Sequence, residues 1–139
     1  ILAYDIIRDR QFAEDNNIIY CDLEYLLQSS DIISIHSNYN TNNENMISND
    51  QFSLMKDSAI FINTSRGELV NEKDLYETLK QKKIAGAGID VFKEEPYSGN
   101  LTILENIIVT PHIAAYGKEV RIKMEMEAVT HLIEGLSGS

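Results

Sequence analysis

The chain has 139 residues, of which 43% are hydrophobic and 24% charged, enough for one domain with its own core. Twenty-two acidic against twelve basic residues give a formal net charge of −10, which argues against a nucleic-acid surface because phosphate binding needs a concentrated basic patch. With a single cysteine and no apolar run long enough to span a bilayer, we expect a cytoplasmic protein without a nucleic-acid or membrane partner.

The first part of the chain predicts two strands and one helix. Residues 1–4 are apolar and end at Asp5, as in a buried parallel strand. Asp22 can cap a helix whose apolar residues share one face: Leu23, Leu26 and Leu27. Residues 31–36 read as the next strand. The Asn-rich segment 38–49 reads as a loop with room for one helical turn, because asparagine favours turns over helix interiors.

The middle of the chain alternates strands with a helix. Residues 58–63 predict a strand, and residues 85–91 and 106–110 predict two more. Between the first two, Asn71 opens a helix, and Asp74 stands three residues on in a capping-box relation. Strands separated by helices imply parallel pairing through right-handed crossovers, hence an α/β fold with a doubly wound parallel sheet.

The chain is expected to close with a long helix. Residues 118–134 form an amphipathic pattern, and Gly135 is a plausible helix stop. Residues 136–139 read as a flexible tail. With no internal linker, residues 1–135 form one unit.

Asp5 is the first candidate site residue. An acid at a strand end is where dinucleotide folds bind ribose hydroxyls, although Asp also often begins a turn. The glycine-rich phosphate loop should lie about 20 residues earlier, yet only four residues precede Asp5. The only Gly-x-Gly, at residues 86–88, lacks the third glycine. Either Asp5 has no such role, or the first strand and the glycine-rich loop are absent.

Arg66, Glu95 and His112 are the candidate catalytic residues. They stand in the contexts Asn-Thr-Ser-Arg-Gly, Glu-Glu-Pro and Thr-Pro-His-Ile-Ala-Ala. An arginine can hold a substrate carboxylate with its planar fork, a histidine can donate a proton, and a carboxylate can orient that histidine. Together they are what a 2-keto acid reductase needs.

Two longer stretches, residues 55–70 and 83–92, with Glu94-Glu95-Pro96 after the second, resemble signatures of the D-isomer-specific 2-hydroxyacid dehydrogenases. This is the family of D-lactate and D-3-phosphoglycerate dehydrogenases. The resemblance runs from Asp5 to about Gly135. It implies a Rossmann-like NAD-binding domain in residues 1–135 that is partial, because the first strand, the glycine-rich loop and the separate substrate domain are absent.

The resemblance assigns roles to the catalytic set. Arg66 corresponds to the arginine that binds the substrate carboxylate and carbonyl. His112 corresponds to the acid/base that gives a proton to the carbonyl oxygen as hydride reaches the carbon. Glu95 corresponds to the acid that orients this histidine.

The resemblance also implies an NAD site and no metal. Asp90 corresponds to the acid near the nicotinamide carboxamide, and Asp5 would repel the 2′-phosphate of NADP although Arg8 and Arg10 follow it. The expected cofactor-binding residues are Asp5, Asn43, Thr64, Ser65, Arg66, Asp90, His112, Ile113, Ala114 and Ala115.

The function implied for the complete protein is NAD-dependent interconversion of a small 2-keto acid and a D-2-hydroxy acid, the chain alone being inactive. Family members commonly dimerise through this domain, so a homodimer is expected. Two alternatives remain open: a corepressor-like or regulatory NAD-sensing protein on the same fold, and a remnant that folds by pairing with another copy through an exposed sheet edge.

Overall fold

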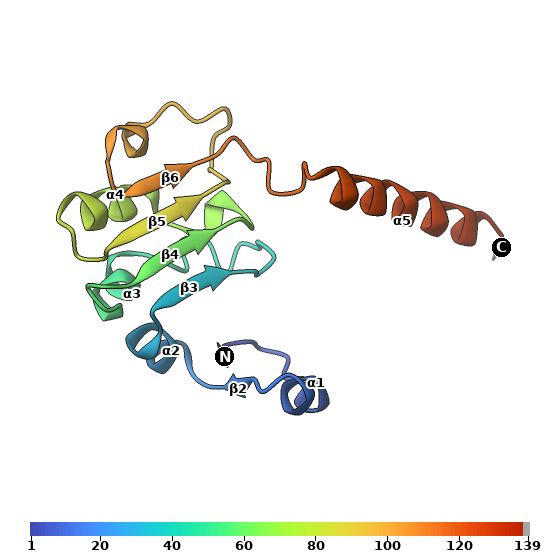
Figure 1. Cartoon of the computed structure of the whole chain (residues 1–139), viewed down its shortest axis with the longest axis horizontal. Helices are drawn as coiled ribbons and strands as arrows, with labels where there is room; N and C mark the ends of the chain where they lie inside the picture. The colour runs from blue at the N-terminus through green and yellow to red at the C-terminus, as the bar shows by residue number, and fades with distance from the viewer. Residues whose placement is uncertain (138–139) are drawn as a thin grey trace.

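The computed structural model describes residues 1–137, and its strands form two separate parallel sheets (Figure 1). The smaller sheet joins β1 (Leu2–Ala3) to β2 (Ile19–Tyr20). The larger has four strands in chain order: β3 (Ile32–Ile35), β4 (Ile60–Asn63), β5 (Gly86–Ile89) and β6 (Ile107–Val109). Every pairing is parallel, which confirms the predicted α/β class.

Residues 1–137 contain five α-helices and two 3₁₀ turns, of which all but α5 connect strands. They are α1 (Arg10–Asp15), α2 (Leu23–Ser29), α3 (Asn49–Leu54), η1 (Gly67–Leu69), α4 (Glu72–Lys80), η2 (Asn100–Ile103) and α5 (Lys118–Ser137). Helix α2 packs against α3, and α3 against α4. These three form one helical layer beside the four-stranded sheet (Figure 1).

Side-chain caps explain where the predicted helices begin. Asp22 accepts a hydrogen bond from Tyr25 N at 2.7 Å, which starts α2, and Asn71 accepts one from Asp74 N at 3.1 Å, which starts α4. The reverse half of the predicted capping box does not form. The Asp74 carboxylate instead accepts a hydrogen bond from Asn49 N at 2.9 Å, so it ties α4 to the first turn of α3.

Besides the two 3₁₀ turns, three short elements were not predicted: α1, β2 and α3. Helix α3 begins directly after the Asn-rich loop, where Gln51 Oε1 accepts hydrogen bonds from Ser48 N at 3.2 Å and from Ser48 Oγ at 2.8 Å. Helix α1 is capped by Asp9, which accepts from Phe12 N at 2.9 Å. Elements of two to six residues carry too few periodic positions to stand out in a sequence.

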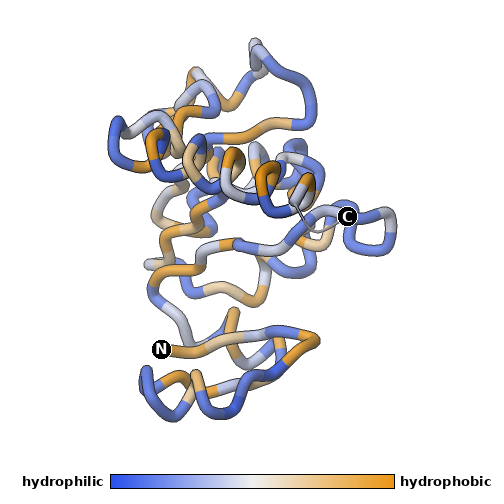
Figure 2. Tube along the Cα trace, turned by 90° about the vertical axis from the view of Figure 1, so that its right-hand side faces the viewer, coloured by the Kyte–Doolittle hydropathy of each residue, from blue (hydrophilic) through white to orange (hydrophobic). Residues whose placement is uncertain are grey.

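The core lies between the helical layer and one face of the larger sheet. Alternate strand residues face it, and Phe61 meets Phe52 of α3 edge to face, with 5.3 Å between ring centroids. In Figure 2 the hydrophobic stretches follow the strands and helices, while the loops are mostly polar. The opposite face is open: Ile32 and Ile108 are 64% and 72% exposed.

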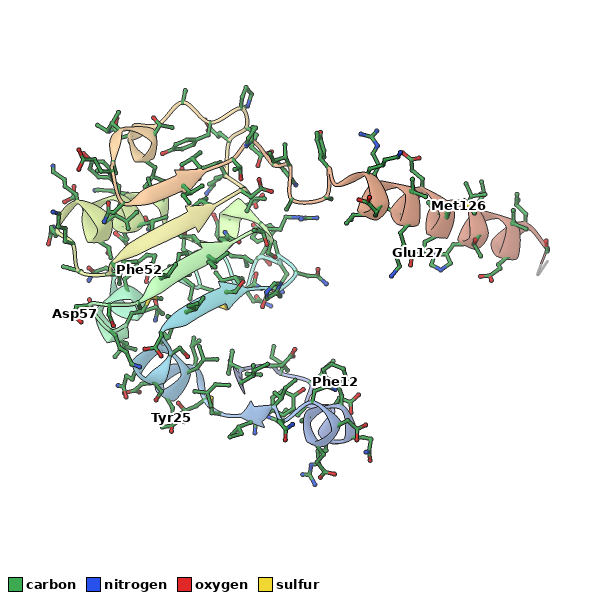
Figure 3. All side chains as sticks on the ribbon, viewed as in Figure 1. Phe12, Tyr25, Phe52, Asp57, Met126 and Glu127 are labelled. Carbon is green, nitrogen blue, oxygen red and sulfur yellow. The ribbon has the colours of Figure 1, made fainter. Side chains whose placement is uncertain are left out.

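Helix α5 stands clear of the sheet (Figures 1 and 3). It buries none of its described residues. The predicted stop at Gly135 is wrong, since the helix continues through Ser137. Residues 136 and 137 of the expected tail are thus helical, and residues 138–139 lie outside the described residues. No helix in residues 1–137 has the length and hydropathy to cross a membrane.

Strands β1 and β3, one from each sheet, are not hydrogen-bonded to each other, and a gap separates the two sheets there (Figure 1). A cavity of about 490 Å³ lies there, lined by residues of both strands. In a doubly wound dinucleotide fold, whose strand order is 3-2-1-4-5-6, the first strand lies between the second and the fourth. Strands β1 and β3 of this chain correspond to that second and fourth strand, so the gap lies where the first strand of such a fold stands.

Candidate active site

The carboxyl ends of the central strands bring three distant segments together. Asn63 ends β4 and leads to Arg66, Asp90 follows β5, and His112 follows β6 by three residues. Parallel strands all end at the same edge of a sheet, and open α/β sheets bind ligands there. The fold therefore gathers the predicted catalytic segments at one edge.

Asn63 shapes the turn that carries Arg66. Its side chain is 1% exposed; its Oδ1 accepts from Ser65 N at 3.1 Å, and its Nδ2 donates to Arg66 O at 2.9 Å. Ser65 Oγ donates to Ser37 O at 2.6 Å. Sequence reasoning missed this role of Asn63, although a polar residue ending an apolar strand was a visible signal.

Gly67 lets the Arg66 turn lie against the loop after β5. A Cβ at Gly67 would stand 2.1 Å from the carbonyl carbon of Phe92 and 2.4 Å from Lys93 N. These distances are far below van der Waals contact, so a side chain there would push the two loops apart. The loop after β5 also carries Glu95.

Glu95 and His112 form a hydrogen-bonded pair. His112 Nδ1 lies 2.8 Å from Glu95 Oε2, and Glu95 Oε1 accepts from Phe92 N at 3.0 Å. The bond from Phe92 N, followed by that from His112, lowers the pKa of Glu95 below its ordinary value. With Nδ1 engaged by a carboxylate, Nε2 is the ring nitrogen left for a ligand.

Asp90 holds the loop on which His112 sits. Its carboxylate, 4% exposed, accepts from Thr110 Oγ1 and from the backbone N–H groups of Ile113, at 2.9 Å, and Ala114, at 2.8 Å. Burial raises the pKa of Asp90, but these hydrogen bonds outweigh it, and the pKa lies below its ordinary value. Both carboxylate oxygens are thus engaged by the loop.

His112 has a left-handed backbone conformation, with φ of 55°. Residues other than glycine rarely adopt it, and it persists where surrounding contacts impose it, often at functional sites. Here the contacts include the hydrogen bond from His112 N to Asp90 O at 2.8 Å. The position of the imidazole therefore depends on Asp90.

Some of the expected site residues line one of two cavities. One of about 200 Å³ is lined by Arg66, Glu95 and His112 among others, so the structure brings the catalytic set together. A second, of about 590 Å³, is lined by Asp5, Asn43 and further residues of the loop after β3. The remaining expected cofactor residues line neither cavity: Thr64, Ser65, Asp90, Ile113, Ala114 and Ala115.

Asp5 and Asn43 already have hydrogen bonds within the chain. Asp5 Oδ1 accepts from Ile7 N at 2.9 Å. Asn43 Nδ2 donates to Asn38 O at 2.8 Å, and its Oδ1 accepts from Asn40 N at 2.8 Å. Asn43 therefore organises the Asn-rich loop around the larger cavity.

A parallel α/β sheet with a polar cavity at its carboxyl edge and an Arg, His and carboxylate set beside it is typical of a dinucleotide-binding oxidoreductase domain. Residues 1–114 match the family described as D-isomer specific 2-hydroxyacid dehydrogenase, NAD binding domain. The chain belongs to this family.

Relatives of known name agree with this assignment. The chain is 42% identical to a glyoxylate reductase of Korarchaeum cryptofilum over 96% of its length and 41% of that protein. It is 38% identical to a hydroxypyruvate reductase of Blautia hydrogenotrophica, over 100% of its length and 44% of that protein. D-lactate dehydrogenase with NAD+ from Lactobacillus jensenii has a TM-score of 0.86 and 34% identity, with 99% of this chain and 46% of that chain covered. The chain thus spans less than half of each.

Proposed function

We propose that the chain is part of an NAD-dependent oxidoreductase that interconverts a 2-keto acid and a D-2-hydroxy acid. The observation that carries this proposal is the His112 and Glu95 pair, 2.8 Å apart, which lines the same cavity as Arg66. Membership of the family and the names of the relatives support it.

In this proposal residues 1–135 are a partial NAD-binding domain, and a substrate domain completes the site from outside the chain. The relatives named above support this division, since the chain spans only 41–46% of their length. No glycine-rich phosphate loop occurs in the sequence. The chain alone is therefore expected to bind NAD weakly and to be inactive.

Three side chains perform the proposed chemistry. Arg66 holds the substrate carboxylate, because its guanidinium offers two parallel donors and stays charged. His112 gives a proton from Nε2 to the carbonyl oxygen. Glu95 keeps the ring in place through Nδ1 and stabilises the imidazolium, which donates the proton in this direction and forms again in the reverse one. NADH, when bound, supplies the hydride to the carbonyl carbon.

The larger cavity is the proposed cofactor site. Asp5 follows β1 by two residues, near the strand end where such folds bind ribose hydroxyls, and its carboxylate disfavours a 2′-phosphate. The cofactor would be flanked, between the two cavities, by Asn43, Thr64 and Ser65. Asp90 holds the loop of residues 112–115 beside it. These roles fit NAD.

The corepressor-like alternative has no support among the named relatives, which are all reductases or dehydrogenases. We retain the proposals of a cytoplasmic location, of no nucleic-acid or membrane partner, and of a homodimer. The net charge of −10 supports the lack of a nucleic-acid partner. The exposed apolar residues of α5 support self-association.

The test is a steady-state assay of the complete protein with NADH or NADPH and glyoxylate, pyruvate, hydroxypyruvate, 2-oxoglutarate or 3-phosphohydroxypyruvate. His112→Ala and Glu95→Gln should each lower kcat/KM by about 100-fold or more, since positioned acid–base groups contribute that much. His131→Ala, an exposed histidine on α5, is the matched control and should retain full activity. Undiminished turnover in His112→Ala would contradict the mechanism.

A second measurement concerns the chain by itself. Titration calorimetry with NAD should show weak binding or none. Tight binding would show that the chain needs no glycine-rich loop for the cofactor.

A further inference from the structure

The cavity beside His112 is lined by two cations and two carboxylates. Arg66 and Lys93 supply the positive charges, and Glu68 and Glu95 the negative ones. A substrate anion entering this cavity meets all four. The cations that are not yet paired therefore determine how many anionic groups this chain's part of the site can hold.

The charge of Lys93 is already matched. Its Nζ lies 2.8 Å from Glu44 Oε1. The bond to Glu44, followed by that carboxylate's charge and more weakly by Glu68, raises the pKa of Lys93 above its ordinary value. A second carboxylate, Glu72, accepts the backbone N–H of Lys93 at 2.8 Å. The surroundings of Lys93 are thus acidic.

Arg66 is the cation left for a ligand. Within residues 1–137 its guanidinium forms no ion pair, and Nη1 donates to a neutral acceptor, Ser65 O, at 2.6 Å. One planar guanidinium matches one carboxylate. Lys93 is paired with Glu44 and Glu95 with His112, so a second anionic group on the same ligand would meet the carboxylate of Glu68 in this cavity, and like charges repel.

We propose that this site selects 2-keto acids whose only negative charge is the 2-carboxylate, and that Glu68 is a specificity-determining residue that repels a second anionic group. This inference rests on the proposed function and narrows its substrate class. Hydroxypyruvate and 3-phosphohydroxypyruvate share a carbon skeleton and differ by one phosphate, so they isolate the effect.

The experiment compares kcat/KM for these two substrates in the complete protein with NADH. The unmodified protein should prefer hydroxypyruvate by about tenfold or more. Glu68→Gln should reduce this preference by about threefold, the size expected for one partly screened charge. Glu44→Gln, which frees the Lys93 ammonium, should shift the ratio in the same direction. Added salt should weaken both effects.

Glu105→Gln is the matched control. Glu105 is an exposed carboxylate that precedes β6, at the opposite edge of the sheet from His112, so its removal should leave the ratio unchanged. Equal or better use of 3-phosphohydroxypyruvate by the unmodified protein would overturn the inference and leave the proposed function intact. An unchanged ratio in Glu68→Gln would overturn the role of Glu68. If no keto acid is reduced, both proposals fail.

Discussion

Asp90 connects the end of β5 to the loop after β6, across 20 to 24 residues of sequence. One buried carboxylate satisfies two backbone N–H groups and a hydroxyl, and buried donors without partners are costly. These contacts give Asp90 a structural role beside the expected one near the nicotinamide carboxamide. A single residue thus determines whether His112 is presented to the cavity.

Replacing Asp90 by Asn should destabilise the chain. The amide keeps the shape but loses one acceptor, so one of the bonds to Thr110, Ile113 or Ala114 is lost. We expect a decrease of about 1–3 kcal/mol in the free energy of unfolding, measured by urea denaturation. Asp57→Asn, an exposed site (Figure 3), should change it by less than about 0.5 kcal/mol. Equal effects would show that the Asp90 bonds contribute nothing.

The lowered pKa values of Asp90 and Glu95 predict how the chain responds to acid. A carboxyl whose pKa falls on folding stabilises the fold at pH above its unfolded value, and this is lost as the pH drops through the folded value. The hydrogen bonds to Asp90 hold its folded pKa below the ordinary value of an aspartate. The thermal midpoint should lose this contribution below about pH 4. Asp90→Asn should show a smaller acid-induced decrease between pH 5 and 3 in thermal melts followed by circular dichroism.

The sequence predicted the catalytic residues of the site but not the residues that hold them in place. Arg66, Glu95 and His112 were found because each stands in a short distinctive context, and the fold gathers them as expected. The holding roles of Asn63 and Asp90 were not found. They depend on which N–H groups a turn directs toward them, and residue types alone do not encode that geometry.

At the scale of elements, the turn carrying Arg66 and the loop carrying Glu95 are held in backbone contact by Gly67. Two other contacts brace the same region. Asn45 N donates to Glu68 O at 2.8 Å, and Lys93 bonds to Glu44. The Asn-rich loop after β3 and the loop after β5 that carries Glu95 therefore both contact the turn that carries Arg66.

Gly67→Ala should separate these loops. Its Cβ would clash with the backbone at Phe92 and Lys93, so we expect about 3 kcal/mol of destabilisation by urea denaturation. Gly88→Ala is the matched control, since nothing lies within 4 Å of the Cβ it would add, and it should cost less than about 0.5 kcal/mol. Similar losses in the two variants would contradict the close approach at Gly67.

Elements with a clear period or cap were predicted well. The strands β3 to β6 lie in short, mostly apolar runs. The helices α2 and α4 have visible caps at Asp22 and Asn71. Helix α3 was missed because its neighbours are Asn-rich, although the Ser48 and Gln51 pair was a usable signal. The end of α5 was misplaced because glycine stops a helix only where the chain turns.

At the scale of the whole molecule, two apolar surfaces have no partner within residues 1–137. One is the face of the larger sheet opposite the helical layer, with Ile32 and Ile108 exposed. The other is α5, where Met126, Val129 and Ile133 are 62%, 51% and 57% exposed and share one face. Parallel sheets are ordinarily covered on both faces. Burial of either surface against a second copy of the chain would be favourable.

The chain should therefore self-associate through α5. Sedimentation velocity should show a concentration-dependent shift from monomer to dimer, as burial of apolar surface drives association. The double variant Met126→Gln and Ile133→Gln should remain monomeric, whereas Glu127→Gln, on the same helix (Figure 3), should behave as the unmodified chain. A monomer at all concentrations would contradict the homodimer proposal for this chain.

The gap between β1 and β3 also bears on how a ligand and the fold influence each other. No ladder joins the two sheets, and a pair of two-residue strands is marginal by itself, so we expect residues 1–21 to open as a unit before the larger sheet unfolds. The larger cavity takes Asp5 from this unit and Asn43 from the other. A molecule bound there would contact both units and stabilise their association, so its observed affinity would be lower by the free energy needed to hold the two units together.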